Sequence, residues 1–291
     1  MKGILLAGGH GTRLYPITKS VSKQLLCIYD KPMVYYPLSI LILAGIKDIM
    51  IISTPDDLPD YKKLLGDGKS FGISLKYLEQ TNPGGIAEAF VIAEKFIDLE
   101  DVMLVLGDNI FYGNGFISLL KNSISKVEKT KTAVIFGSYV DNPSRYGVVS
   151  FDINYNAKEI IEKPVKPDSN YAVIGLYFYP NSVIEISKQI KPSKRGELEI
   201  TSINNFYLSQ KKLGIEILDT QFTWLDTGTP DSLLEASNFI QTIEKRTGKK
   251  IACIEEIVYE LGYINKNQLY NLCESLPSSD YVNYLKKNLN K

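Results

Sequence analysis

The chain opens with Gly3-Ile4-Leu5-Leu6-Ala7-Gly8-Gly9-His10-Gly11-Thr12-Arg13, an apolar run that stops at a glycine-rich turn. The run is typical of a buried strand. Three glycines within four positions allow a sharp turn that brings backbone N–H groups against an anion. The turn lacks the Lys-Ser or Lys-Thr pair of a P-loop, and Leu14 stands where a dinucleotide fingerprint has its third glycine. A purely structural turn is therefore one alternative, and a phosphate-binding turn helped by Arg13, Lys19 and Lys23 is the other.

The sequence that follows alternates short apolar runs with amphipathic stretches. The expected strands are 3–6, 48–53, 75–78, 102–106, 132–137, 148–151 and 172–179, and the expected helices are 37–44, 59–65, 86–96 and 116–127. This alternation predicts a layered α/β domain with a largely parallel sheet. Beyond Ser150 the helices become fewer, which favours a mixed sheet within the same domain. From about Ser232 only helical spacing remains, so we expect a helical C-terminal tail.

The composition argues against several classes of protein. The 291 residues include 33 basic and 33 acidic side chains, and this zero net charge argues against a nucleic-acid partner. With 44% hydrophobic and 23% charged residues, the chain is typical of a globular protein. Its apolar runs are far shorter than the roughly 20 residues of a membrane helix, so no membrane partner is expected. Three widely spaced cysteines without a CxxC pair favour a reducing, cytoplasmic setting over a disulfide scaffold or a zinc site.

Several ordered motifs together support a resemblance to a known family. They are Gly3–Gly9 with Gly11–Leu14, Ser22–Leu26, Tyr29–Met33, Val105–Gly113, Arg145–Val149, Glu162–Pro164, Arg195–Thr201 and Trp224–Thr229. Over essentially its whole length the chain resembles the sugar-1-phosphate nucleotidyltransferases, and Ser22–Leu26 favours their thymidylyl branch over their uridylyl branch. The resemblance implies transfer of dTMP from dTTP to α-D-glucose 1-phosphate, giving dTDP-glucose and pyrophosphate, with Mg²⁺ as cofactor. It also implies the first step of dTDP-rhamnose and deoxysugar biosynthesis, and a homotetramer.

The same resemblance implies a Rossmann-like nucleotide-diphospho-sugar transferase fold. Such a fold has three α/β/α layers around a mixed central sheet, here with a helical C-terminal tail. We expect a core over residues 1–231, in which 1–115 bind the nucleotide and 116–231 bind the sugar phosphate. Residues 232–291 are expected to form a helical appendage packed on that core.

Asp108 and Asp226 are the candidate metal ligands. Each follows an apolar run, and carboxylates at the carboxyl ends of neighbouring strands converge on the crevice where α/β folds bind ligands. By itself Gly107-Asp108-Asn109 is more often a turn cap than a metal site. Both aspartates, however, match metal positions of the family, and Mg²⁺ takes a few carboxylates together with waters. The resemblance therefore implies that they hold the ion.

The other candidate residues follow from the resemblance. It implies that Arg13 and Lys23 act at the nucleotide phosphates and Lys163 at the sugar phosphate, as the catalytic cations of an in-line attack. The expected nucleotide-binding residues are Leu6, Gly8, Gly9, Gly11, Thr12, Arg13, Gln80, Gly85 and Asp108. Among these, Gln80 and the Gly85 backbone are expected to face thymine. The expected sugar-phosphate-binding residues are Asn109, Tyr146, Gly147, Glu162, Lys163, Val173 and Arg195.

Two alternatives stay open. A sister enzyme of the same fold, using UTP or another sugar phosphate, would differ only in its base and sugar contacts. A silent regulatory paralogue would have lost some of the catalytic cations or aspartates, and all of them are present. His10 is the only histidine, and we reject it as a general base because an ionised phosphate needs none. Glu88 and Ile174 replace a common Gln and a common Thr of the family, which bears on base and sugar preference.

Overall fold

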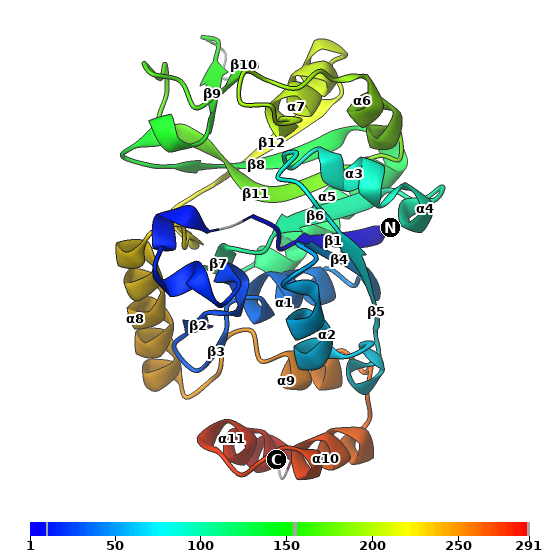
Figure 1. Cartoon of the computed structure of the whole chain (residues 1–291), viewed down its shortest axis with the longest axis vertical. Helices are drawn as coiled ribbons and strands as arrows, with labels where there is room; N and C mark the ends of the chain where they lie inside the picture. Colours follow the sequence, from blue (N-terminus) through cyan, green and yellow to red (C-terminus); the bar gives the residue numbers. More distant parts are fainter. Residues whose placement is uncertain (10, 154–155, 290–291) are drawn as a thin grey trace.

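The computed structural model describes residues 1–9, 11–153 and 156–289 (Figure 1). His10 lies outside these residues, so the hypothesis about its role stays a prediction.

A mixed sheet of nine strands runs through the centre of the described chain (Figure 1). The strands are β1 (Lys2–Leu6), β4 (Asp48–Ser53), β5 (Ser74–Glu79), β6 (Val102–Leu106), β8 (Ala133–Tyr139), β9 (Gly147–Phe151), β10 (Ala157–Glu162), β11 (Tyr171–Tyr179) and β12 (Leu213–Leu218). Their order is β10-β9-β11-β6-β1-β4-β5, with β8 paired to β11 and β12 to β8. β1, β4, β5 and β6 are parallel, whereas β11 runs antiparallel to both β6 and β8. The expected mixed sheet is confirmed.

Helices cover both faces of this sheet. One face carries α1 (Tyr35–Leu43), α2 (Leu58–Leu65), α5 (Phe116–Thr130) and α9 (Ile254–Glu260). The other carries α3 (Glu88–Ile92), α4 (Glu94–Ile97), α6 (Val183–Gln189) and α7 (Ile200–Ser209). Successive residues of a strand point to opposite faces of the sheet. Leu5 and Met103 pack in the hydrophobic core on the first face, and Ile4 and Leu104 pack in the core on the second. The three-layer α/β/α architecture is thereby confirmed.

Some local predictions are corrected by the structure. The helix expected over 86–96 is divided into α3 and α4, because Ala93 leaves helical geometry between them. The sequence pattern missed β10, β12, α6, α7, β7 (Asn109–Gly113), and the hairpin of β2 (Cys27–Ile28) with β3 (Lys31–Pro32). The run before Asp226 forms β13 (Phe222–Asp226), which pairs with β7 in a separate two-stranded sheet rather than beside β6.

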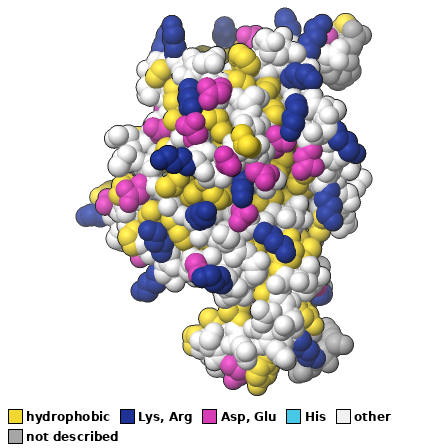
Figure 2. Space-filling model, turned by 90° about the vertical axis from the view of Figure 1, so that its right-hand side faces the viewer, with side chains coloured by type: hydrophobic (Ala, Val, Ile, Leu, Met, Phe, Trp, Pro, Cys, Tyr) yellow, Lys and Arg dark blue, Asp and Glu magenta, His cyan; other side chains and the backbone are white. Residues whose placement is uncertain are grey.

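The chain beyond Thr229 is helical, as expected. α8 (Pro230–Thr247) begins with a capping box between Thr229 and Ser232, and it contacts β2 and β13. α9 packs on α1, while α10 (Lys266–Ser275) and α11 (Asp280–Leu289) pack on each other far from the sheet (Figure 1). Figure 2 shows a narrow waist above this last pair. The division of the chain at residue 231 stays a prediction.

A buried ion cluster ties α8 to the β2–β3 hairpin. Lys31 is 4% exposed and Glu244 is 7% exposed, and their charged atoms lie 3.1 Å apart. Lys250 pairs with both Asp30 and Glu244, so two cations meet two anions. Although burial alone would raise it, the adjacent lysines hold the pKa of Asp30 below its ordinary value. Mutual pairing offsets part of the cost of removing four charges from water.

The surface agrees with the balanced composition. On the face shown in Figure 2, basic and acidic side chains are interspersed. Within the described residues no helix combines the length and the apolar character that crossing a membrane would require.

Candidate active site

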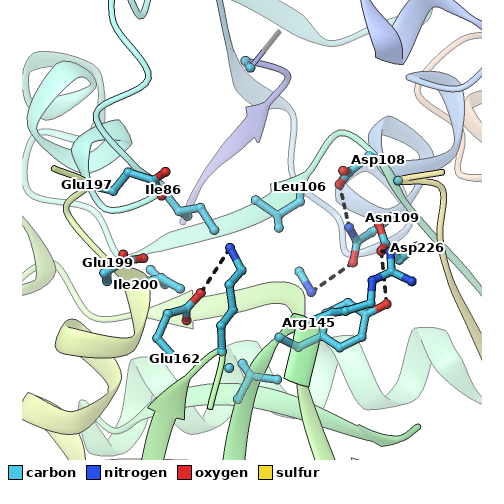
Figure 3. A pocket seen from close by; sticks show the side chains of 18 of the residues that line it. Ile86, Leu106, Asp108, Asn109, Arg145, Glu162, Glu197, Glu199, Ile200 and Asp226 are labelled. Carbon is cyan, nitrogen blue, oxygen red and sulfur yellow. Dashed lines mark hydrogen bonds and ion pairs between the residues drawn. The ribbon is translucent and has the colours of Figure 1, made fainter. Parts of the chain in front are cut away.

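A cavity of about 720 Å³ opens at the carboxyl ends of β1 and β6 and reaches across to β9, β10 and β11. The predicted site residues that line it are Gly8, Gly9, Gly11, Thr12, Arg13, Lys23, Asp108, Asn109, Tyr146, Gly147, Glu162, Lys163, Val173, Arg195 and Asp226. Figure 3 shows the two aspartates on one side of the cavity and three glutamates on the other. The structure thus brings together residues that lie more than 200 positions apart in the sequence.

The glycine-rich turn presents two cations to this cavity. Gly11 has a left-handed backbone with φ of 56°, and Thr18 Oγ1 donates to its carbonyl at 2.9 Å, which folds the turn back on itself. The Arg13 guanidinium lies against Gly228, where an added Cβ would stand 2.9 Å from Nη2. Lys23 is only 6% exposed. Arg13, next to the glycine-rich turn, and Lys23, ten residues further along the chain, therefore both line the cavity.

Asp108 and Asp226 lie together although one follows β6 and the other ends β13, which belong to different sheets. Asn109 stands opposite Asp226 in the β7–β13 pair, so this pair delivers Asp226 beside the end of β6. Lys23 Nζ donates to Asp108 Oδ2 at 2.5 Å. Asp226 Oδ2 accepts a hydrogen bond from Tyr146 Oη at 3.1 Å. The convergence expected from neighbouring strands is achieved by this separate ribbon instead.

The pKa values of the two carboxyl groups move in opposite directions. Burial would raise the pKa of Asp108, but the Lys23 ammonium holds it below its ordinary value. Burial and the negative charge of Asp108 raise the pKa of Asp226. The two carboxylates therefore repel each other, and a cation between them would relieve that repulsion.

The donor set also bears on which metal would suit the site. Within the described residues no group of three or more His, Cys, Asp or Glu side chains is placed to hold a metal. Asp108 and Asp226 thus supply hard oxygen ligands without a complete protein cage. This arrangement fits Mg²⁺, which keeps several waters and binds through one or two carboxylates and substrate phosphates.

Thr227 clamps the two aspartate-bearing segments together. It is fully buried, and both its backbone N–H and its Oγ1 donate to the Asp108 carbonyl, at 3.2 and 2.8 Å. Because Thr227 directly follows Asp226, these two bonds fix how far apart the carboxylates lie.

Asn109 braces the same end of the cavity. It is 3% exposed, and its Nδ2 donates to Asp108 Oδ1 at 2.7 Å. Its Oδ1 accepts from Trp224 Nε1 at 2.6 Å and from the Gly175 N–H at 3.0 Å. These bonds join β7, β11 and β13 around the aspartates. The predicted contact with a sugar hydroxyl would have to share these atoms, so bracing is the role that the geometry favours.

The opposite wall combines acidic and basic side chains. Glu162 Oε2 accepts from Thr201 Oγ1 at 2.6 Å, and Glu162 Oε1 lies 3.7 Å from Lys163 Nζ and 3.6 Å from Arg195 Nη2. Arg195 also donates to both carboxylate oxygens of Glu199, which is 7% exposed. The guanidinium is thereby held in one orientation at the cavity wall, where it could bind an anion.

Three of the predicted nucleotide-binding residues are Leu6, Gln80 and Gly85, which lie next to the cavity lining in sequence or in space. Leu6 is buried at the end of β1, and Gln80 directly follows β5. Gly85 has φ of 99°, and its loop is fixed by the Leu198 N–H, which donates to the Gly84 carbonyl at 2.7 Å. None of the three lines the cavity. Their contacts with a nucleotide stay predictions.

Sequence reasoning missed several lining residues. They are Gln24, Ile86, Leu106, Arg145, Gly175, Tyr177, Glu197, Glu199, Ile200, Thr201, Trp224 and Gly228. Many of them lie inside the quoted motifs, which was the available signal; one is Arg145, whose Nη2 stands 3.3 Å from Asp226 Oδ2. Ile86 has no such signal, because an apolar residue gives no chemical hint of a site. Figure 3 shows Ile86 and Leu106 facing the cavity between its two charged ends.

The chain is similar to known nucleotidyltransferases in both sequence and structure. A family model described as nucleotidyl transferase matches residues 2–243. The chain is 52% identical to the glucose-1-phosphate thymidylyltransferase of Neisseria meningitidis serogroup A, over 100% of both chains. It is 51% identical to that of Mycobacterium tuberculosis, over 98% of both chains. A solved structure from Bacillus anthracis is assigned as a glucose-1-phosphate thymidylyltransferase. It matches this chain with a TM-score of 0.75 and 40% identity, and the match covers 82% of this chain and 94% of the Bacillus anthracis chain. A UDP-glucose pyrophosphorylase in complex with UDP-glucose has a TM-score of 0.73 at 26% identity, over 83% of this chain and 98% of its own.

Proposed function

Because this chain belongs to the nucleotidyl transferase family, and within it to the glucose-1-phosphate thymidylyltransferases, we propose that it transfers dTMP from dTTP to α-D-glucose 1-phosphate, forming dTDP-glucose and pyrophosphate. The observation that carries the proposal is the distribution of charge in one cavity. Arg13 and Lys23 gather with the two aspartates at one end, and Lys163 and Arg195 lie at the other. Such a cavity can hold two phosphate-bearing substrates at once.

The reaction demands little covalent work from the protein. An oxygen of the sugar phosphate attacks the α-phosphorus of dTTP, and pyrophosphate leaves in line. The protein must hold two mutually repelling anions in this geometry and neutralise charge as it moves to the leaving group. The attacking phosphate is already ionised, so the proposal needs no general base.

In this proposal the cations divide the work. Arg13 binds the β- and γ-phosphates and the departing pyrophosphate, and Lys23 stabilises charge at the α-phosphate. Lys163 and Arg195 hold the sugar phosphate; the Lys163 N–H donates to the Tyr146 carbonyl at 2.9 Å, whereas the Tyr146 hydroxyl donates to Asp226. Mg²⁺, when bound at the aspartates, would supply further neutralisation of the nucleotide phosphates.

Four finer points belong to the same proposal. They are the Mg²⁺ requirement, the place at the start of dTDP-rhamnose biosynthesis, a homotetramer and a cytoplasmic setting. A UTP-using enzyme is the alternative, because hydrogen bonds to a pyrimidine edge do not read the methyl group of thymine. That methyl group alone can give discrimination of about 10- to 200-fold.

The proposal is tested by pyrophosphate release from the purified full chain with glucose 1-phosphate and Mg²⁺. Each of dTTP, UTP, CTP, ATP and GTP is supplied in turn. Turnover is expected to be fastest with dTTP, slower with UTP and lost on chelation of the metal. A preference for UTP would move the chain to the sister activity. Binding of dTTP without any turnover would contradict the proposed reaction.

Thr227→Val is expected to lower kcat by up to about fivefold, since it removes a hydroxyl hydrogen bond to the Asp108 carbonyl worth about 1 kcal/mol. Thr227→Ser keeps the hydroxyl and is the matched control, expected to retain nearly full turnover. Steady-state kinetics and thermal unfolding of both variants make the measurement. Equal kcat values in the two variants would show that the hydroxyl bond does not position the aspartates.

A further inference from the structure

The side-chain amide of Gln80 is held from one side only. Gln80 is 7% exposed, and its backbone N–H donates to the Ser53 carbonyl at 2.8 Å, which extends the β4–β5 pairing. Its Nε2 donates to the Gly85 carbonyl at 3.1 Å and to Glu88 Oε2 at 2.7 Å. Both N–H groups of the amide are thus bound to the loop and the helix that follow β5.

These partners leave the amide a single orientation. A backbone carbonyl and a carboxylate only accept hydrogen bonds, so an amide turned by 180° would place its oxygen against two acceptors. Gln80 Oε1 therefore faces the other way, toward Gly8, where an added Cβ would stand 2.8 Å from it. Gly8 lines the cavity. The edge of the amide that approaches the cavity is consequently an acceptor.

Of the two acceptors that hold the Gln80 amide, Glu88 forms the stronger hydrogen bond. Its carboxylate is charged, and hydrogen bonds to charged acceptors are stronger than those between neutral groups. Glu88 is the first residue of α3, and its side chain folds back over Gly84 toward Gln80. Across the described part of the chain no ion pair involves Glu88, so its interaction with the amide is not shared with a neighbouring cation.

We propose that Glu88 is a positioning residue for base selection, which fixes the Gln80 amide so that its oxygen reads a ring N–H of the base. Thymine and uracil carry such a donor at N3, whereas the N3 of cytosine is an acceptor and would meet the amide oxygen unfavourably. The inference rests on the proposed function, and it adds the reason why one class of pyrimidine nucleotide is accepted and the other rejected. It assigns no role to the methyl group of thymine.

The test compares kcat/KM for dTTP, dUTP and dCTP in the full chain. Glu88→Met removes the acceptor while keeping a side chain of similar length, so only the Gly85 carbonyl still holds the amide. The ratio of kcat/KM for dTTP over dCTP is expected to fall about tenfold or more, the effect of losing one charged hydrogen bond. The ratio of dTTP over dUTP is expected to stay unchanged, because both bases carry the N3 donor.

Further variants separate positioning from a general structural effect. Glu88→Gln retains an acceptor and is expected to keep most of the dTTP over dCTP discrimination. Glu94→Met changes the first residue of α4, whose carboxylate bonds Lys188 instead, and is expected to leave all ratios unchanged. Glu88→Ala, a good helix former, replaces the Met variant if that one does not fold.

The outcomes are distinguishable. A purely structural Glu88 would lower kcat/KM for all three nucleotides equally, and an unchanged dTTP over dCTP ratio in an active Glu88→Met variant overturns the inference. A ratio that falls as far in Glu88→Gln as in Glu88→Met overturns it as well. If the unaltered chain turns over none of these nucleotides, the proposed function itself fails, which is a separate result.

Discussion

Asp226→Asn is expected to lower kcat/KM for dTTP by about 10²- to 10³-fold with little loss of stability. Asparagine keeps the shape of the side chain and can still accept the hydrogen bond from Tyr146 Oη. It removes one of only two carboxylates available to Mg²⁺ at this end of the cavity. The remaining carboxylate, Asp108, is already engaged by Lys23. We therefore expect both a lower kcat and a higher Mg²⁺ requirement.

Pyrophosphate release measured as a function of Mg²⁺ concentration checks this expectation. Asp219→Asn is the matched control, because Asp219 is an exposed acid shortly before β13 that bonds the Gln221 N–H at 2.8 Å outside the cavity. The control is expected to retain the rate and Mg²⁺ dependence of the unaltered chain. If Asp226→Asn does the same, Asp226 is not a metal ligand.

Lys23→Met is expected to lower kcat by about 10²- to 10³-fold, because it removes a buried positive charge beside Asp108, where the proposal puts the reacting phosphates. The effect should fall on kcat more than on KM, since charge at the α-phosphate grows mainly in the transition state. Within the protein, Asp108 and Asp226 would be left facing each other with one cation fewer.

Calorimetric titration with dTTP, beside the kinetics, separates lost chemistry from lost binding or folding. Lys19→Met is the control: Lys19 follows the same turn, but it is exposed and does not line the cavity. Comparable losses in both variants would mean that net charge near the turn matters, rather than the specific placement of Lys23.

Much of the fold could be predicted from the sequence because its strands are nearly continuous apolar runs. Val102–Leu106 is buried on both faces between helices, and such a run has few alternatives to a central parallel strand. β12 was missed for the opposite reason. Its residues are mostly half-buried at a sheet edge, so Leu213–Leu218 carries no strong periodic signal.

The candidate site could likewise be predicted only in part from the sequence. Asp108 could be placed from sequence, because it follows a strand whose direction and burial were clear. The position of Asp226 depends on the antiparallel pairing of β13 with β7, a contact between segments about 115 residues apart. The bond from Gln80 to Glu88 likewise depends on a helix that begins later than the pattern predicted. Such contacts arise from tertiary packing rather than from local residue preference.

The ion cluster of Asp30, Lys31, Glu244 and Lys250 limits where this molecule can be divided. The segment that the family model recognises ends at residue 243, one position before Glu244. A fragment cut there would keep the pair of Lys31 with Asp30 and lose the contacts that Glu244 and Lys250 make with this pair. Because the lost contacts tie α8 to the β2–β3 hairpin, a fragment that ends at residue 243 is expected to be less stable than the full chain.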